Sequence, residues 1–176
     1  MRAERAVQRV VRPVLGLALL VLCGCGTGYC WRPSVPESAR TVSVPTFRNE
    51  SAVSELGAIA ARQILREFQR EGTFKIRTGD DAAIEVQGVI KTALSGINAY
   101  DRRSGMRVSA YKMTANAEVS VIDKRKRKVL VNNRKYVASA DYTAGQDLTT
   151  AQRSASGRVM EDLARQVVDD VLNLKW

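Results

Sequence analysis

The sequence contains no histidine, and its three cysteines, Cys23, Cys25 and Cys30, all lie within the first thirty residues. Histidine is the side chain that most often acts as a general acid or base near neutral pH, and it is also the commonest metal ligand. The cysteines are too close together for the spaced pairs of a disulfide framework or a zinc site. We therefore expect no bound metal and no cofactor apart from covalently attached lipid.

No other arrangement of residues suggests catalysis. Adjacent carboxylates occur twice, as Asp80 with Asp81 and as Asp169 with Asp170. The first pair lies in a predicted turn and the second on the polar side of a predicted helix, so we interpret both as solvated surface. The glycines do not form a phosphate-binding loop between a strand and a helix. The sequence therefore predicts a protein that is not an enzyme.

The first twenty-four residues have the pattern of a signal peptide. Four arginines between positions 2 and 12 precede an uninterrupted apolar run over residues 13–23. A positive segment followed by an apolar run of this length is typical of secretion signals. The run is far shorter than the roughly eighteen residues that a membrane-spanning helix needs. We therefore expect residues 1–24 to be removed from the mature protein.

The end of this segment resembles the bacterial lipobox. Leu22, Cys23 and Gly24 precede Cys25, so a small residue stands just before the expected cut. We expect Cys25 to carry a diacylglycerol thioether and an N-acyl chain; the alternative is an unmodified thiol behind an ordinary secretory signal. Buried acyl chains contribute about 0.8 kcal/mol per CH₂ and would anchor the protein to a membrane. Gly26, where an aspartate would favour retention, indicates sorting to the outer membrane.

The mature chain begins with a short tether, residues 25–40, which contains two prolines and two glycines and shows no apolar periodicity. Its fifteen residues after the lipid cysteine reach at most about 50 Å, so the folded domain should stay close to its membrane. Cys30 has two interpretations: a residue at the membrane interface beside Tyr29 and Trp31, or the site of an intermolecular disulfide.

Residues 41–176 are predicted to form a single domain, since 45% hydrophobic and 26% charged residues are typical of a globular chain. The predicted strands cover residues 41–47, 84–97, 106–122 and about 129–137. The predicted helices are one that Ser51 caps and Gly72 closes, and a last one that begins at a Thr149 and Gln152 capping box. We predict an α+β fold: a two-layer sandwich of a four-stranded, mainly antiparallel sheet with two helices packed on one face.

Positive charge is concentrated between residues 102 and 135, within a chain of net charge +10. The basic residues of this segment are Arg102, Arg103, Arg107, Lys112, Lys124, Arg125, Lys126, Arg127, Lys128, Arg134 and Lys135. We predict an electropositive stripe along the strands that attracts an anionic partner. The alternative is a solvated face that protects a sheet edge from aggregation. Nucleic acid is not expected, because the chain is secreted and no aromatic side chains interleave the charges.

Several segments of the mature chain match one known pattern. They are Cys25 and Gly26 with nearby Tyr29, the run TVSVPTF over residues 41–47 with the helix after it, and the run YKMT over residues 111–114 with the final helix. In this order, and together with the lipobox, they resemble the LptE family of outer-membrane lipopolysaccharide-assembly lipoproteins.

The resemblance implies a non-enzymatic subunit that sits as a plug inside the β-barrel partner LptD, assists its assembly and helps to deliver lipopolysaccharide to the outer leaflet. The domain would lie on the periplasmic side of the outer membrane or inside the barrel. The family's basic contact to lipopolysaccharide matches Arg103, with Arg102 as its neighbour. Arg107 and Lys112, from the same basic segment, complete the predicted lipopolysaccharide-binding site. Residues 124–128 depart from the family's pattern, and lipid binding there is a separate hypothesis.

The start of the domain also resembles a second group of proteins. The run VSVPTFRN over residues 42–49 is similar to the opening strand of outer-membrane lipoproteins that activate peptidoglycan synthases. Those proteins generally need a long flexible tether to cross the periplasm, and the tether here is short. Activation of a peptidoglycan synthase is therefore the alternative function. Loss of surface lipopolysaccharide on depletion would indicate the first function, and a cell-wall defect would indicate the second.

Overall fold

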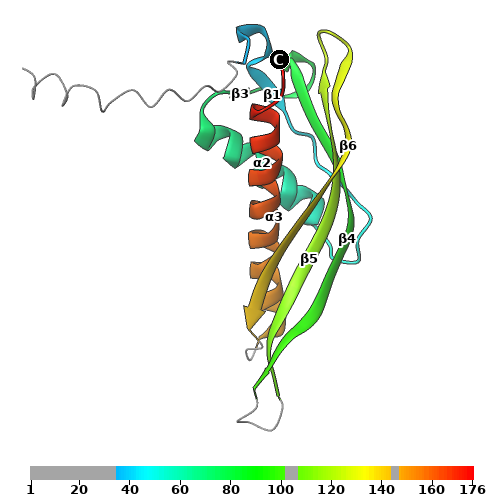
Figure 1. Ribbon diagram of the computed structural model, residues 1–176, viewed down its shortest axis with the longest axis vertical. Helices are drawn as coiled ribbons and strands as arrows, with labels where there is room; N and C mark the ends of the chain where they lie inside the picture. The colour runs from blue at the N-terminus through cyan, green and yellow to red at the C-terminus, as the bar shows by residue number, and fades with distance from the viewer. Residues whose placement is uncertain (1–34, 102–106, 144–146) are drawn as a thin grey trace, which may run out of the picture. The chain divides into compact units, whose positions relative to one another are not determined.

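The computed structural model of the protein describes residues 35–101, 107–143 and 147–176. The predicted signal peptide, Cys25 and nearly all of the tether lie outside the described residues. In chain order the described elements are the 3-10 helix η1 (Glu37–Ala39), β1 (Thr41–Ser43), β2 (Arg48–Asn49), α2 (Leu56–Glu71), β3 (Lys75–Ile76), the 3-10 helix η2 (Gly79–Asp81), β4 (Ile84–Asp101), β5 (Arg107–Asp123), β6 (Lys128–Thr143) and α3 (Leu148–Leu172) (Figure 1).

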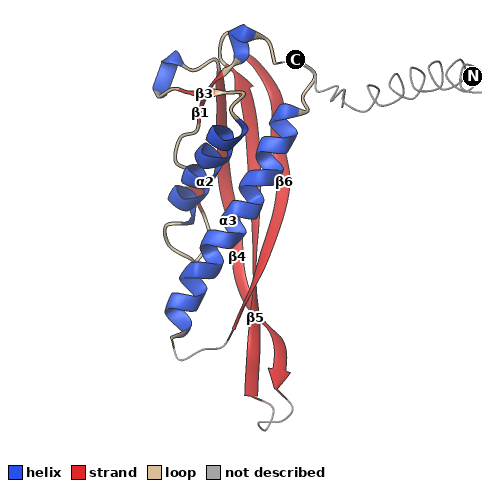
Figure 2. Cartoon of the chain, turned by 90° about the vertical axis from the view of Figure 1, so that its left-hand side faces the viewer, coloured by secondary structure: helices blue, strands red, loops and turns tan. Residues whose placement is uncertain are grey.

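The strands form one mixed sheet with two helices on one of its faces (Figure 2). The strand order is β3-β1-β4-β5-β6, and β2 also pairs with β4. The long strands β4, β5 and β6 pair with one another in antiparallel fashion, whereas β1 and β2 run parallel to β4. The α+β class is thus confirmed. The predicted four-stranded, mainly antiparallel sheet was wrong, because the sheet has six strands and is mixed.

One of the two extra strands is the short β3, and the other has a local cause in residues 41–49. Alternation of apolar and polar residues predicted one strand, but β1 ends at Ser43 and β2 begins only at Arg48. Pro45 lies between them, and proline has no N–H to donate to a neighbouring strand. The parallel pairing follows from α2, because a helix between two strands carries the chain back so that the second strand can run in the same direction as the first.

The core lies between the helices and the face of the sheet that they cover. The predicted apolar faces of both helices are confirmed, and so is the alternation along β5. Phe68 of α2 meets Phe74 edge to face, with ring centroids 5.2 Å apart. The fully buried larger side chains are Phe68, Leu56, Ile64, Ile84, Ile90, Met113, Met160, Leu163, Val42, Val86, Val119 and Val121.

One close approach fixes the chain before α2 against the sheet. Phe47 is buried, and its ring lies over Gly88 of β4, where a Cβ atom would stand 2.4 Å from the Phe47 Cε2 atom. Only glycine leaves room for the ring at this position. The Phe47 ring thus fills the space that a side chain at position 88 would occupy.

The ends of the helices correct two sequence predictions and confirm a third. Helix α2 begins at Leu56, and the predicted cap Ser51 instead donates its hydroxyl to Asn49 Oδ1 over 2.7 Å. Gly72 ends α2 as predicted, with φ at 72° and its N–H donating to the Phe68 carbonyl. The predicted capping box at the start of α3 was wrong, because Asp147 accepts the Thr150 N–H over 3.0 Å.

The strands of the β4–β5 hairpin are longer than the helical layer that covers them. β4 has 18 residues and β5 has 17, but the last buried position on β4 is Ala93, and the first on β5 among the described side chains is Met113. We call residues 84–93 and 113–123 the packed half, and residues 94–101 and 107–112 the distal hairpin. Figures 1 and 2 show the distal hairpin continuing past the start of α3.

Candidate functional site

The structure describes only part of the predicted lipopolysaccharide-binding site. Arg102 and Arg103 lie outside the described residues. Arg107 is the first residue of β5, where its backbone pairs with Asp101, and its side chain is not described. Lys112 lies five residues further along β5 and is exposed. Arg107 and Lys112 therefore belong to the same distal hairpin, and the roles of all four basic residues stay predictions.

The distal hairpin exposes large apolar side chains that the sequence analysis did not single out as a binding surface. Leu94 is 70% exposed, and Ile97 and Tyr100 are each 52% exposed. All three lie on β4 beyond the reach of the helices. Exposed apolar side chains scattered singly are ordinary on proteins, but a group of them beside polar residues is typical of interaction sites. Periodicity could not reveal this group, since an apolar residue in a strand has the same pattern whether or not a helix covers it.

Lys112 and the exposed Leu94 share one face of the distal hairpin, whereas Ile97, the cross-strand partner of Tyr111, lies on the opposite face. Lys112 is the cross-strand partner of Gly96, and Leu94 lies two residues from Gly96 on β4. Cross-strand partners and residues two apart point to the same face of a sheet. Asp141 of β6 is the cross-strand partner of Lys112 on its other side. The face around Lys112 is thus apolar and cationic, with one carboxylate at its margin.

The second basic cluster, residues 124–128, lies at the opposite end of β5, where it joins β6. The buried Asp123 organises this turn, because its Oδ1 accepts the N–H groups of Arg125 over 3.0 Å and Lys126 over 2.9 Å. Lys124 Nζ lies 2.8 Å from Asp80 Oδ1 and 3.1 Å from Glu85 Oε2. Hydrogen bonds to Asp80 and then to Glu85 raise the pKa of Lys124. Lys124 therefore fastens the turn to the chain before β4.

The predicted electropositive stripe is interrupted between its two ends. Arg134 Nη1 lies 2.8 Å from Asp170 Oδ2 of α3. Near the middle of the sheet, Lys91 Nζ lies 3.0 Å from Glu50 Oε2 and 3.9 Å from Glu118 Oε2. The acidic partners come mostly from outside residues 102–135, so a count over that segment missed them. The described basic residues thus gather mainly at the two ends, and between them Arg134 is paired with Asp170 while Lys135 is exposed.

The carboxylates that the sequence analysis interpreted as solvated surface make structural contacts. Asp170 accepts the Tyr136 hydroxyl over 2.7 Å in addition to its ion pair with Arg134. Burial and then the hydrogen bond to Asp170 raise the pKa of Tyr136. Asp80 pairs with Lys124, whose hydrogen bond lowers the pKa of that carboxyl. Asp170 thus joins β6 to α3, whereas the side chain of Asp80 is fully exposed, as expected of solvated surface.

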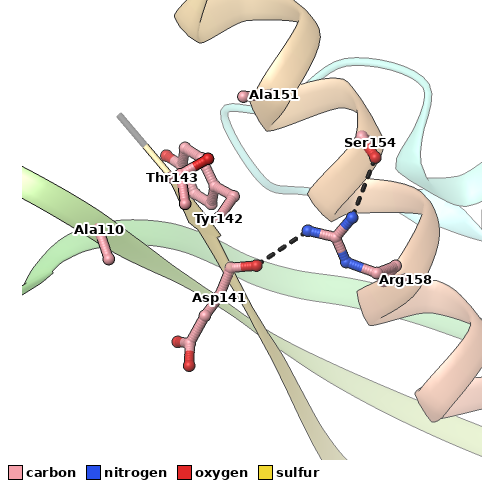
Figure 3. A pocket seen from close by; sticks show the side chains of 7 residues that line it. All are labelled: Ala110, Asp141, Tyr142, Thr143, Ala151, Ser154 and Arg158. Atoms are coloured by element: carbon pink, nitrogen blue, oxygen red, sulfur yellow. Dashed lines mark hydrogen bonds between the residues drawn. The ribbon is translucent and has the colours of Figure 1, made fainter. Parts of the chain in front are cut away.

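A hollow of about 340 Å³ lies between the end of β6 and the first half of α3 (Figure 3). Arg158 of α3 crosses it and donates to the Asp141 carbonyl over 2.8 Å and to Ser154 Oγ over 3.0 Å. The Asp141 carboxylate points away from the guanidinium. Arg158 therefore connects the helix to the backbone of β6. Within the described ranges, no cluster of residues could hold a metal ion, and no helix combines the length and apolar character needed to cross a membrane.

The fold and the distal hairpin define a class of protein: a two-layer α+β domain whose sheet extends a cationic and apolar hairpin beyond its helices. The model of the LptE family, described as lipopolysaccharide-assembly, matches residues 39–171. The match covers well over half of the 176 residues. The chain belongs to the LptE family, which confirms the resemblance found in the sequence.

Solved structures resemble the chain in fold. Protein XCC0632 from Xanthomonas campestris aligns at 11% identity over 81% of this chain and 88% of that chain, with a TM-score of 0.53. The hypothetical protein CT253 from Chlamydia trachomatis aligns at 14% identity over 76% and 96% of the two chains, with a TM-score of 0.51. A minor lipoprotein from Acinetobacter baumannii aligns at 12% identity over 76% and 93%, with a TM-score of 0.47. No relative among the curated proteins matches the chain.

Proposed function

We propose that the mature chain is an outer-membrane lipoprotein, anchored by lipid on Cys25, that assembles with an LptD-type β-barrel and binds lipopolysaccharide through the distal hairpin. Membership of the lipopolysaccharide-assembly family over residues 39–171 is the observation that carries this proposal. The protein acts by binding and not by catalysis. The domain lies on the periplasmic side of the outer membrane or as a plug inside the barrel.

The chemistry of the distal hairpin supports lipopolysaccharide as the ligand. The lipid A part of lipopolysaccharide combines phosphate groups with acyl chains, so a surface that recognises it needs both cations and apolar contacts. Lys112 and the exposed Leu94 lie on one face of the hairpin. Arg102, Arg103 and Arg107 are its neighbours in the chain. Charge-assisted hydrogen bonds from arginine to phosphate are stronger than neutral ones.

The two basic clusters allow a matched test of the binding surface. We expect the double substitution Arg102→Ala and Arg103→Ala to lower the retention of lipopolysaccharide by the full-length protein in a pull-down. The control is the double substitution Arg125→Ala and Arg127→Ala, which removes the same charge from the opposite end of β5. Melting temperatures should stay close to that of the parent chain for both variants, because surface substitutions usually change stability by less than about 0.5 kcal/mol.

The outcome separates specific binding from general attraction by net charge. A loss of lipopolysaccharide with the first variant alone supports the distal hairpin. An equal loss with both variants would mean that total charge governs retention, and unchanged retention with the first variant would remove Arg102 and Arg103 from the site.

The anchor and the alternative function need their own measurements. We expect mass spectrometry of the mature protein to show an acylated Cys25 at the N-terminus, whereas a free thiol there would contradict the lipid anchor. Activation of a peptidoglycan synthase stays the second candidate. Depletion should reduce surface lipopolysaccharide if the proposal is right, and a cell-wall synthesis defect with normal lipopolysaccharide would favour the alternative.

A further inference from the structure

The sheet has two long outer edges with different surroundings. One is the outer edge of β6, which ends the strand order. The other is the outer edge of β4 beyond Lys91, because β1 and β2 pair with β4 only at residues 84–85 and 89–90. We call residues 92–100 the β4 edge. No strand in the described part of the chain pairs with it.

The edge of β6 is protected by side chains of α3. Gln166 Nε2 donates to the Val137 carbonyl over 3.1 Å, and Arg158 Nη2 donates to the Asp141 carbonyl over 2.8 Å (Figure 3). Backbone groups on a free edge can otherwise pair with a strand of another chain, and covering them prevents this. Helix α3 thus occupies acceptors that an added strand would need.

The same contacts show which backbone groups of β4 point outward. The carbonyls of Val137 and Asp141 face α3 and therefore point away from β5. Their cross-strand partners on β5, Asn116 and Lys112, then direct their own backbone groups toward β4. On β4 these two residues pair with Thr92 and Gly96. Alternate residues of an antiparallel strand direct these groups to opposite sides. Ala93 and Ser95 therefore direct their backbone N–H and C=O away from β5. Nearer the start of β4, the Ile90 carbonyl already accepts the Glu50 N–H over 2.9 Å.

Residues 92–97 of the β4 edge lack the features that normally block strand addition, since the bulges of this edge come only after Ile97. Residues 92–100, TALSGINAY, contain no charged residue and no proline. Proteins commonly protect free edges with lysine, proline or a covering element. The β6 strand carries Arg134 and Lys135 as well as the contacts from α3. One edge of the sheet is thus closed, and the other is uncharged and open.

We propose that the β4 edge pairs with an extended strand of a protein partner. This added strand follows β2 along the outer side of β4 and so continues the sheet. The occupant is an uncharged segment with apolar side chains, because Leu94, Ile97 and Tyr100 are exposed beside the edge and no charge in residues 92–100 could pair with a charged strand. A lipid cannot offer the alternating N–H and C=O groups that such an edge selects. A second copy is disfavoured by the net charge of +7 on residues 25–176, which hold 24 Lys and Arg against 17 Asp and Glu.

This inference deepens the proposed function and rests on its protein partner, since it states how the chain and the barrel make contact. The test compares Ser95→Pro on the β4 edge with Ser139→Pro on the β6 edge. Both serines are exposed, and both direct their N–H away from β5. Ser139 does so because it is two residues from both Val137 and Asp141, whose carbonyls face α3. Proline removes that N–H without removing a hydrogen bond of the existing ladder.

The full-length chain with an affinity tag is co-expressed with the LptD-type barrel, and the barrel retained by the tag is measured. We expect Ser95→Pro to lower retention at least about fivefold, which corresponds to the loss of one or two hydrogen bonds, and Ser139→Pro to leave it unchanged. If either proline variant melts well below the parent, Ser95→Lys and Ser139→Lys replace the pair, because a lysine blocks an edge while keeping the N–H.

Each outcome decides between the two proposals. Loss of the barrel with the Ser95 variant alone supports strand addition at the β4 edge. Equal retention by both variants, or equal loss, overturns strand addition and leaves the barrel partnership intact. If the tagged, unsubstituted chain retains no barrel, the barrel partnership of the proposed function and this inference are both overturned. If the chain is isolated as a dimer and Ser95→Lys dissociates it, the occupant of the β4 edge is a second copy of this chain and not a strand of the barrel.

Discussion

The packed half and the distal hairpin are formed by the same two strands, yet they differ in what lies against them. Ile90, Ala93 and Met113 are buried beneath the helices, whereas Leu94, Ile97 and Tyr100 are exposed a few residues further on. The ladder between β4 and β5 continues through both regions, with bulges near Ile90 and Ile97. Backbone pairing and a few side-chain contacts, such as Tyr111 stacked on Tyr142, thus maintain the distal hairpin, whereas packing beneath the helices stabilises the other half. We infer that stability and binding are separated along one pair of strands.

The largest expected difference concerns two isoleucines of β4. Ile90 is fully buried and Ile97 is 52% exposed. We expect Ile90→Ala to lower the free energy of unfolding by about 2–5 kcal/mol, because it removes buried methyl groups and leaves a cavity. Ile97→Ala should cost less than about 1 kcal/mol, and lipopolysaccharide retention should fall instead for Leu94→Ala, on the face of Lys112. Denaturant unfolding and pull-downs measure the two effects, and similar losses of stability would contradict the division.

Two glycines of the same strand give a second comparison. A Cβ on Gly88 would stand 2.4 Å from the Phe47 ring, whereas a Cβ on Gly96 meets nothing within 4 Å. Gly88→Ala should therefore cost about 1–3 kcal/mol, as overpacking does in cores. Gly96→Ala should be neutral or slightly stabilising, since alanine restricts the unfolded chain more than glycine does. Thermal unfolding of the two variants side by side would detect the difference, and a destabilised Gly96 variant would mean that something covers the distal hairpin.

A tyrosine pair tests the contact between α3 and β6. Tyr136 is buried and donates to Asp170, whereas Tyr100 is half exposed. We expect Tyr136→Phe to cost about 1 kcal/mol, the net value of one hydrogen bond, and Tyr100→Phe to cost almost nothing. Asp170 keeps its ion pair with Arg134 in the first variant, which limits the loss. Chemical denaturation resolves the comparison, and an unchanged midpoint for Tyr136→Phe would show that the hydroxyl contact contributes no stability.

The smallest expected effect is a pH dependence at the start of α3. Hydrogen bonds from the Thr150 hydroxyl and N–H lower the pKa of Asp147 below its ordinary value of 3.8. The ionised cap therefore stabilises the folded chain fully above pH 3.8, and this contribution is lost as the pH falls through the lower folded pKa. We expect amide exchange in the first turn of α3 to accelerate below that pH. Asp147→Asn, which keeps an acceptor but does not titrate, should remove this pH dependence, and its persistence would assign it to another carboxyl.

Much of the fold could be predicted from periodicity. The apolar faces of α2 and α3 and the alternation along β5 depend on which residues are buried, and burial leaves a pattern in the sequence. The end of α2 could also be predicted, because Gly72 adopts a left-handed conformation that glycine favours. The starts of both helices could not, because several residues near each start can act as caps, and tertiary contacts decide which one does.

The sheet topology and the binding surface could not be predicted from the same signals. Alternation says that Val42 lies in a strand, but it does not give the direction of the neighbouring strand. The pairing of Arg134 with Asp170 joins residues 36 positions apart, so a local count of charge overlooked it. Leu94 is exposed because a bulge between Ile90 and Thr92 turns it to the face opposite the buried Ala93, and alternation does not show where a bulge occurs. Arg102 and Arg103 rest on the resemblance alone, and their roles stay predictions.

The difference in rise between helix and strand sets the reach of the hairpin. The 25 residues of α3 span about 38 Å at 1.5 Å per residue, whereas the 18 residues of β4 span about 59 Å at roughly 3.3 Å per residue. The overhang of about 20 Å is roughly two thirds of the thickness of a bilayer's hydrocarbon layer. A molecule held at the far end of the hairpin would thus lie well beyond the helices, so that its binding need not disturb the core.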